Sequence, residues 1–157
     1  MPLSLRDFRP EDLEAAYRLD QACFEPGIAY SRDQLRSFLS QRAAVALVAE
    51  TENGLAGFAI GHRSGSSGHI VTIDVAKADR RRGAARMLLS EMLRRLRSDG
   101  VRRVRLEVDL RNAGAIRFYE KMGFRTTRTL TSYYGKDRDG LEMVRELSRS
   151  PSPKSKI

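Results

Sequence analysis

Apolar and polar positions alternate along short stretches of the chain, a pattern that predicts strands with one buried face. Residues 3–8 (LSLRDF) and 101–110 (VRRVRLEVDL) show this alternation. Residues 69–75 (HIVTIDV) instead carry Ile and Val on both faces, as a strand in the middle of a sheet does. Further strands are expected at residues 44–50, 55–63, 124–130 and 141–147, with turns at 52–54 and 133–140. We expect residues 62–69 (HRSGSSGH) to form a flexible connection.

Apolar residues recur at intervals of three and four in four other segments, which predicts helices. These segments span residues 10–24, 31–41, 83–99 and 112–123. Ser31 and Asn112 are suitable N-caps, and Gly100 and Gly123 suit the position just after a helix end. Strand, helix and strand between residues 69 and 110 then make a right-handed βαβ unit.

The length of 157 residues suits one domain, which we expect at residues 1–147. Residues 148–157 (SRSPSPKSKI) hold too few apolar side chains to fold, so a disordered basic tail is expected there. Cys23 is the only cysteine, which excludes an internal disulfide and a cysteine-based zinc site. The chain also shows no signal-peptide pattern and no membrane-length apolar run. We therefore predict a cytoplasmic protein that does not contact a membrane.

Net charge is +9, and most of this excess lies in one segment. Residues 77–105 contain eleven basic side chains against three acidic ones. Such an imbalance favours encounters with polyanions, which include nucleic acid, ribosomes and phosphorylated cofactors. No aromatic residues are interleaved with the basic ones as a base-stacking surface needs, so specific nucleic-acid binding is not expected.

Residues 80–85 (RRRGAA) stand between the predicted central strand and the following helix. Backbone N–H groups at a helix start lack partners and the helix dipole is positive there, so an anion is favoured. Small residues let a phosphate approach the backbone, and arginines can surround it with charge-assisted hydrogen bonds. The spacing matches neither a Walker loop nor G-x-G-x-x-G. A solvated basic helix start is an equally good interpretation of these residues alone.

Several of these elements together resemble the GNAT acetyltransferases. The shared features are R-x-x-G-x-A at Arg80, Gly83 and Ala85 after HIVTIDV, LEV at residues 106–108, and NAGAIRFYEKMGF at residues 112–124. The resemblance extends over about residues 3–147 and is strongest toward bacterial ribosomal-protein-alanine N-acetyltransferases and archaeal N-terminal acetyltransferases. It implies an α/β (α+β) fold with a mixed central sheet of about seven strands flanked by about four helices.

The resemblance also implies roles for particular residues. Glu107 would be the general base and Tyr119 the general acid. The expected acetyl-CoA-binding residues are Ile73, Asp74, Val75, Arg80, Arg81, Arg82, Gly83, Ala84, Ala85, Arg86 and Asn112. The expected substrate-binding residues are Phe24, Tyr30, Tyr133 and Tyr134. Acetyl-CoA would be a cosubstrate, and no metal is expected because His62 and His69 are not spaced as ligands with any partner.

Each candidate has a structural alternative. Glu107 lies on the polar face of its strand beside Arg105, where it could be a paired structural carboxylate. Tyr119 belongs to the buried stripe of its helix. Asp74 could be a second base or a substrate contact, although a hydrogen-bonded structural role suits it better. Cys23 is expected to be a small buried apolar residue.

The resemblance implies transfer of an acetyl group from acetyl-CoA to an amine. An α-amine with a pKa of ~7.8 is roughly a quarter neutral near pH 7.4, whereas a lysine with a pKa of ~10.4 is neutral about one part in a thousand. A single carboxylate base suits the easier case, so a protein N-terminus, as in ribosomal proteins, is the expected acceptor. The alternatives are a small-molecule or lysine amine, or a nucleic-acid or ribosome-binding module. We expect a monomer or weak dimer, and the ribosome is one candidate partner.

Overall fold

The computed structural model describes residues 2–148. Its strands are β1 (Ser4–Asp7), β2 (Ala44–Thr51), β3 (Gly54–Ser64), β4 (Ser67–Val75), β5 (Arg103–Asp109), β6 (Arg125–Leu130) and β7 (Gly140–Glu146). Its helices are α1 (Leu13–Cys23), α2 (Arg32–Leu39), α3 (Ala84–Ser98) and α4 (Ala113–Lys121), with short 3-10 turns η1 (Pro10–Asp12) and η2 (Lys77–Asp79). The expected mixed sheet of seven strands with four helices is confirmed over this range.

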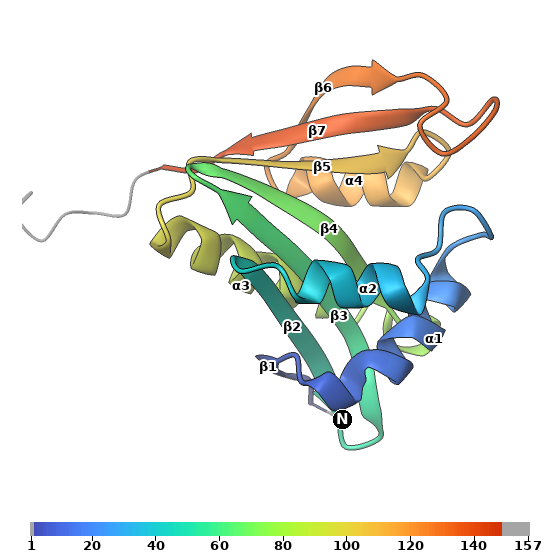
Figure 1. Ribbon diagram of the computed structural model, residues 1–157, viewed down its shortest axis with the longest axis vertical. Coiled ribbons are helices and arrows are strands. Elements are labelled where there is room, and N and C mark those ends of the chain that lie inside the picture. The colour runs from blue at the N-terminus through green and yellow to red at the C-terminus, as the bar shows by residue number, and fades with distance from the viewer. Residues whose placement is uncertain (1, 149–157) are drawn as a thin grey trace, which may run out of the picture.

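The seven strands form one sheet in the order β1-β2-β3-β4-β5-β7-β6. β4 is the fourth strand of seven, as its apolar residues on both faces predict. Its pairing with β5 is parallel and all other pairings are antiparallel. Figure 1 shows β4 and β5 meeting at one end and diverging toward the other.

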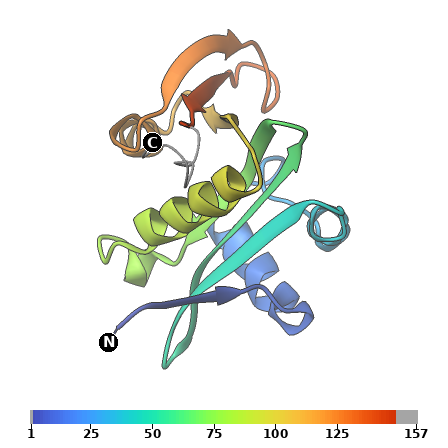
Figure 2. The same cartoon turned by 90° about the vertical axis from the view of Figure 1, so that its left-hand side faces the viewer.

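Helices lie on both faces of the sheet (Figure 2), and an apolar core lies between the sheet and the helices on each face. On one face, the apolar stripe of α3 and the partly buried residues of α4 pack on the strands. On the other face, α1 and α2 cover Val48, Phe58 and Ile60 of β2 and β3. Alternate residues such as Leu47 and Ala59 belong to the first core, because successive side chains of a strand point to opposite faces.

Local sequence signals set the helix ends as expected. The Ser31 side chain accepts a hydrogen bond from the Gln34 N–H and starts α2, and Asn112 does the same for α4 through the Ala115 N–H. Gly100 follows the end of α3 with a φ of 92°.

The expectation of a flexible connection at residues 62–69 is wrong. β3 continues to Ser64 and β4 begins at Ser67, so only Gly65 and Ser66 form the turn. His62 pairs with His69 and Arg63 with Gly68 across this hairpin. Gly65 has a φ of 59°, a left-handed conformation that glycine adopts readily, so these residues close a tight turn.

Close contact between β3 and β4 requires glycine at position 57. A Cβ atom added there would lie 2.6 Å from the backbone oxygen of Asp74. We expect Gly57→Ala to lower the free energy of unfolding by about 1–3 kcal/mol, because the two strands must separate to accept the methyl group. Chemical denaturation measures this. Gly114→Ala is the control, since a Cβ there meets no described atom closer than 4.0 Å and alanine favours the helix; equal destabilisation by both variants would contradict the explanation.

Candidate functional site

A cavity of about 400 Å³ opens where β4 and β5 diverge. The two strands pair only between Ser67–His69 and Arg103–Arg105, so their further residues leave space between them. The cavity is lined by Cys23, Phe24, Glu25, Ile28, Tyr30, Ile70, Val71, Thr72, Ile73, Leu106, Glu107, Val108, Asp109, Arg111, Asn112, Ala115, Tyr119, Tyr134 and Arg138. Both predicted catalytic residues therefore face the same cavity.

The shape of β4 explains why the sheet opens at this point. Ile60 of β3 pairs with Thr72 but the next residue, Gly61, pairs with Ile70, which leaves Val71 as an extra residue. Such a bulge bends a strand and changes its twist. β4 therefore turns away from β5 directly after their short paired segment.

The bend leaves backbone groups of β4 facing the gap. The Ala76 N–H donates to the Ala56 oxygen of β3. Because backbone groups alternate in direction along a strand, those of Ile73 and Val75 point away from β3. Arg80 Nε donates to the Val75 oxygen at 3.2 Å, so that acceptor already has a partner within the protein. The N–H and C=O of Ile73 are positioned to bind an extended ligand.

Glu107 is held by two basic side chains. Its Oε1 lies 2.7 Å from His69 Nε2, and its Oε2 accepts a hydrogen bond of 2.8 Å from Arg105. Burial alone would raise the pKa of Glu107, yet the hydrogen bond from His69 and the charges of His69 and Arg105 together lower it. The carboxylate is therefore ionised at neutral pH and can accept a proton.

Tyr119 is half-buried and reaches the cavity from α4. Its ring packs against Phe118 and Phe124, with centroid distances of 5.2 and 5.8 Å. Burial raises the pKa of Tyr119, and the nearby charge of Asp74 raises it further. The phenol therefore stays protonated at neutral pH and can donate its hydrogen. Asn112 fixes this helix through its N-cap hydrogen bond of 3.1 Å to Ala115.

Two loops border the cavity on its other sides. Phe24 and Tyr30 line it from the segment between α1 and α2, and Tyr134 lines it from the segment between β6 and β7. Burial raises the pKa of Tyr30 to about 12. Tyr133 contacts Tyr134 edge-to-face with centroids 4.9 Å apart, but it is not among the described lining residues and is 52% exposed.

Arg138 joins these two loops to the sheet. Its guanidinium makes ion pairs with Glu25 of the first loop and with Asp109 at the end of β5, the latter at 2.6 Å. These pairs restrict the separation of the loops at the cavity entrance.

The basic segment before α3 forms a tight turn. Arg81 and Gly83 both have left-handed backbones, with φ of 70° and 84°, and no side chain caps the start of α3. The first N–H groups of this helix are therefore open to a ligand. Arg82 pairs with Asp79 at 2.9 Å and Arg80 bends back toward Val75, so these two arginines have partners in the protein. The side chain of Arg86 is exposed.

Other predicted residues lie away from the cavity. Asp74 is buried on the face of β4 opposite Ile73 and Val75, where its side chain is close to α1 rather than to the cavity. Val75 and residues 80–86 are not among the described lining residues, since they continue from the cavity toward the start of α3. Their roles in binding a cofactor stay predictions.

Sequence reasoning missed His69 and Arg138. The contact of His69 with Glu107 joins residues 38 apart in the sequence and depends on the register of β4 and β5. Across the described residues, no three His, Cys, Asp or Glu side chains gather as a metal site requires. None of the helices in residues 2–148 has the length and apolar character of a membrane span.

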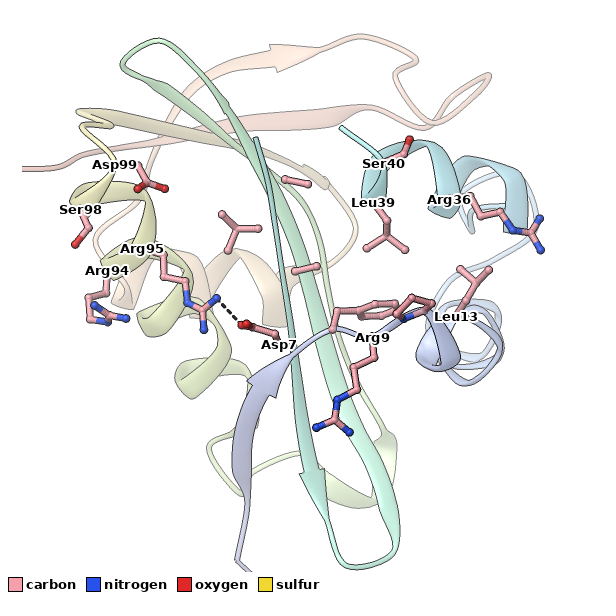
Figure 3. A pocket seen from close by; sticks show the side chains of 15 residues that line it. Asp7, Arg9, Leu13, Arg36, Leu39, Ser40, Arg94, Arg95, Ser98 and Asp99 are labelled. Atoms are coloured by element: carbon pink, nitrogen blue, oxygen red, sulfur yellow. Dashed lines mark hydrogen bonds and ion pairs between the residues drawn. The ribbon is translucent and has the colours of Figure 1, made fainter. Parts of the chain in front are cut away.

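A larger cavity of about 1020 Å³ lies elsewhere, between the β1–β2 edge, α2 and the C-terminal half of α3 (Figure 3). Its basic side chains mostly have acidic partners: Arg95 pairs with Asp7, as Figure 3 shows, and Arg94 and Arg36 pair within their own helices. Its described lining includes no His, Cys or Tyr. Its carboxylates, Asp7 and Asp99, both pair with arginines, and no phenol or imidazole among the described lining residues stands beside them as a proton donor. The cavity between β4 and β5, which holds both a carboxylate and a phenol, is the better candidate site.

Comparisons with known proteins show what the whole chain is similar to. A family model described as the acetyltransferase (GNAT) family matches residues 13–124. An uncharacterised N-acetyltransferase of Methanocaldococcus jannaschii is 27% identical over 150 residues, which are 95% of each chain. A ribosomal protein bS18-alanine N-acetyltransferase of Salmonella typhimurium is 31% identical over 124 residues, 78% of this chain and 81% of the relative. The crystal structure of Ard1 from Thermoplasma volcanium superposes with a TM-score of 0.88 at 28% identity, covering 95% of this chain and all of that one.

Proposed function

Because this chain belongs to the acetyltransferase (GNAT) family, we propose that it transfers the acetyl group of acetyl-CoA to the N-terminal α-amine of a protein. Glu107 acts as general base and Tyr119 as general acid. The observation that carries this proposal is the cavity between β4 and β5, where an ionised carboxylate and a protonated phenol face the same space.

The pantetheine arm of acetyl-CoA donates a hydrogen bond to the C=O of Ile73, which leaves the N–H of Ile73 for the thioester. Its diphosphate lies against the uncapped start of α3, where N–H groups and the helix dipole favour an anion. Arg81 and Arg86 add positive charge beside the start of α3. Acetyl-CoA enters along β4, and the acceptor enters between the loops that carry Tyr30 and Tyr134.

The acceptor is a protein N-terminus rather than a lysine. Acetylating a lysine costs roughly 3.5 kcal/mol more than acetylating an α-amine, because far less of it is neutral. The Salmonella relative is named for an alanine of a ribosomal protein, and alanine carries nitrogen only in its main chain. A ribosomal protein with a free N-terminus is therefore the favoured substrate class.

The reaction moves two protons. The amine nitrogen forms a bond to the thioester carbonyl carbon and loses a proton to Glu107, directly or through water. The N–H of Ile73 faces the gap and polarises the carbonyl oxygen. As the C–S bond breaks, Tyr119 gives its proton to the departing CoA thiolate and regains one from water. His69 contacts Glu107 and is partly exposed, so its imidazole provides a path for the first proton toward solvent.

Two measurements test the proposal. Acetyl-CoA is expected to raise the melting temperature, and the enzyme is expected to acetylate peptides beginning with Ala, Ser, Met or Met-Glu but not their N-terminally blocked forms. The ranking of these peptides identifies the preferred first residue. Turnover on a lysine side chain or a small-molecule amine alone would replace this proposal with its alternative. Salt-sensitive nucleic-acid binding without any response to acetyl-CoA would exclude the enzyme assignment.

Tyr119→Phe removes only the phenol oxygen. We expect it to lower kcat about tenfold with little change in the KM of either substrate, because proton donation to the thiolate occurs after both substrates have bound. Steady-state kinetics measures the split. Tyr17→Phe is the control, because Tyr17 lies on α1 in the other apolar core. A tenfold rise in KM with unchanged kcat would show that Tyr119 binds substrate instead.

A further inference from the structure

Two carboxyl groups are buried beside the candidate site and take no part in the reaction proposed above. Asp20 of α1 is 0% exposed and Asp74 of β4 is 1% exposed. These two elements pack against each other beside the cavity. α1 leads into the loop that borders the acceptor, and β4 carries the backbone groups that face the gap. A pair of buried acids at such a junction needs an explanation, because buried charges without compensation are costly.

The hydrogen bonds of this pair leave one oxygen of each carboxyl without a donor. The Tyr30 N–H donates to Asp20 Oδ2 at 2.6 Å, and the Thr72 hydroxyl donates to Asp74 Oδ1 at 2.5 Å. Asp20 Oδ1 and Asp74 Oδ2 are buried and have no other described partner. The charge and hydrogen-bonding capacity of Asp20 both act on the pKa of Asp74, so the two partnerless carboxyl oxygens are close enough to interact. Two carboxylates cannot bond to each other unless one of them carries a proton.

The surroundings do not neutralise a second negative charge. Arg80 is the cation that faces Asp74, and its guanidinium bonds to the Val75 oxygen and approaches Cys23 Sγ. The other titratable groups near Asp74 are Cys23 on α1, Tyr30 before α2 and Tyr119 on α4, all neutral in their ordinary protonated form. Burial, followed by the hydrogen bond and charge of Asp20, raises the pKa of Asp74 well above its usual value, and Arg80 offsets only part of this.

We propose that Asp20 and Asp74 share one proton, and that this shared proton fixes the loop of residues 24–30 to β4 and so positions the acceptor wall of the site. Asp20 holds the loop directly through the Tyr30 N–H, and Asp74 holds Asp20. Both are positioning residues, since neither lines the cavity. The role of the loop at the acceptor rests on the function proposed above, whereas the shared proton does not.

The hydrogen-bond pattern predicts which substitutions the pair tolerates. In Asp74→Asn, the new amide would accept from Thr72 with its oxygen and donate to Asp20 with its nitrogen. In Asp20→Asn, the new amide would do the same between Tyr30 and Asp74. Either single variant therefore keeps the link without a titrating proton. The double variant sets two amide N–H groups against each other with no acceptor between them.

Chemical denaturation of Asp20→Asn, Asp74→Asn and the double variant tests the link. Each variant lowers the folding equilibrium constant by some factor. We expect the factor for the double variant to exceed the product of the two single-variant factors at least fivefold. Simple additivity would overturn the proposal, because it would mean that the two side chains do not depend on each other.

The pH dependence of stability tests the proton and needs only a single variant. The folded chain keeps one proton that the unfolded chain has released above about pH 5, so the contribution of this pair to stability is greatest at low pH and falls as pH rises. The folding equilibrium constant of the wild type relative to Asp74→Asn should fall about tenfold per pH unit from about pH 5 until the shared proton dissociates. Glu52→Gln, which removes an exposed carboxylate, should show no such slope. A flat ratio from pH 5 upward would overturn the proposal.

Kinetics then tests the positioning role. In the double variant, the KM of the acceptor peptide should rise about tenfold. The affinity for acetyl-CoA, measured by titration, should stay within twofold, because the proposed contact with acetyl-CoA is made by the backbone of β4 and the Asp74 side chain does not line the cavity. Loss of acetyl-CoA affinity with an unchanged peptide KM would contradict the positioning role. If no peptide is acetylated by the wild type, the proposed function fails, whereas the denaturation measurements still decide for or against the shared proton.

Discussion

Glu107→Gln is expected to lower kcat about 100-fold at pH 7, the largest catalytic effect of any single substitution considered for this enzyme. Positioned general bases contribute roughly 10²- to 10⁴-fold to a rate, and glutamine keeps the shape of the side chain without its basicity. The amine must be neutral to attack, so part of the loss should be recovered as pH rises from 7 to 9 and the α-amine, with a pKa of ~7.8, releases its own proton. Turnover of the preferred peptide at several pH values measures both effects.

The pH profile of kcat/KM for the wild type should differ from that of an enzyme whose carboxyl base has a pKa near neutral pH. His69 and Arg105 hold the pKa of Glu107 below its usual value, so Glu107 is already ionised throughout pH 6–9. kcat/KM should therefore rise with pH over this range because the amine loses its proton, without a step from Glu107. A step that disappears in Glu107→Gln would contradict the ion-paired state of this carboxylate.

Glu142→Gln is the matched control for Glu107→Gln. Glu142 of β7 pairs with Glu107 in register, but its carboxylate contacts Thr127 and Arg128. This substitution also removes one carboxylate from the same region of the sheet, so a nonspecific electrostatic effect would appear in both variants. Comparable loss of kcat in both would remove Glu107 from its proposed role.

Local patterns predicted the elements of the fold because they act within a few residues. The alternation in residues 103–109 places Val104, Leu106 and Val108 in the core, and the stripe of α3 is buried as its 3.6-residue period requires. The hairpin at Gly65 and Ser66 was missed for the opposite reason. Its Gly- and Ser-rich composition is typical of mobile connections, whereas the cross-strand ladder of His62 with His69 closes it.

The candidate site was only partly predictable, since many of its contacts join distant segments. Glu107 and Tyr119 were predicted from the family resemblance, and the fold brings both to one cavity. The contact of His69 with Glu107 depends on how the parallel strands β4 and β5 align, and the bond of Arg138 to Glu25 joins residues 113 apart. The pattern of residues within one segment cannot predict these two contacts, because each joins segments that are far apart in the sequence.

The basic turn shows how side-chain partners change an interpretation. Three consecutive arginines suggested one shared anion, but Arg80 and Arg82 bond within the protein. The open backbone at the start of α3, with Arg81 and Arg86 beside it, remains the feature that suits a diphosphate. A bound diphosphate requires a positive charge at position 86, whereas a solvated helix start does not.

Arg86→Glu separates these two interpretations because they predict opposite signs. Arg86 is in the first turn of α3, which contains no acidic residue. A carboxylate there interacts favourably with the helix dipole, so the protein without ligand should keep its stability or gain about 0.3–1 kcal/mol. For a bound diphosphate, the change removes a charge-assisted hydrogen bond and adds repulsion, so the Kd for acetyl-CoA should rise about 10- to 100-fold.

Titration calorimetry gives the affinity and thermal denaturation of the free protein gives the stability. Arg42→Glu, an equal change in net charge at an exposed position between α2 and β2, should leave the Kd within about twofold at the ionic strength of the cell, because distant charges are screened there. Unchanged acetyl-CoA affinity in Arg86→Glu would leave only the solvated helix start as an explanation of this turn. Weaker binding with undiminished stability is the combination that only a diphosphate seated on the first turn of α3 produces, since a structural arginine would lose stability first.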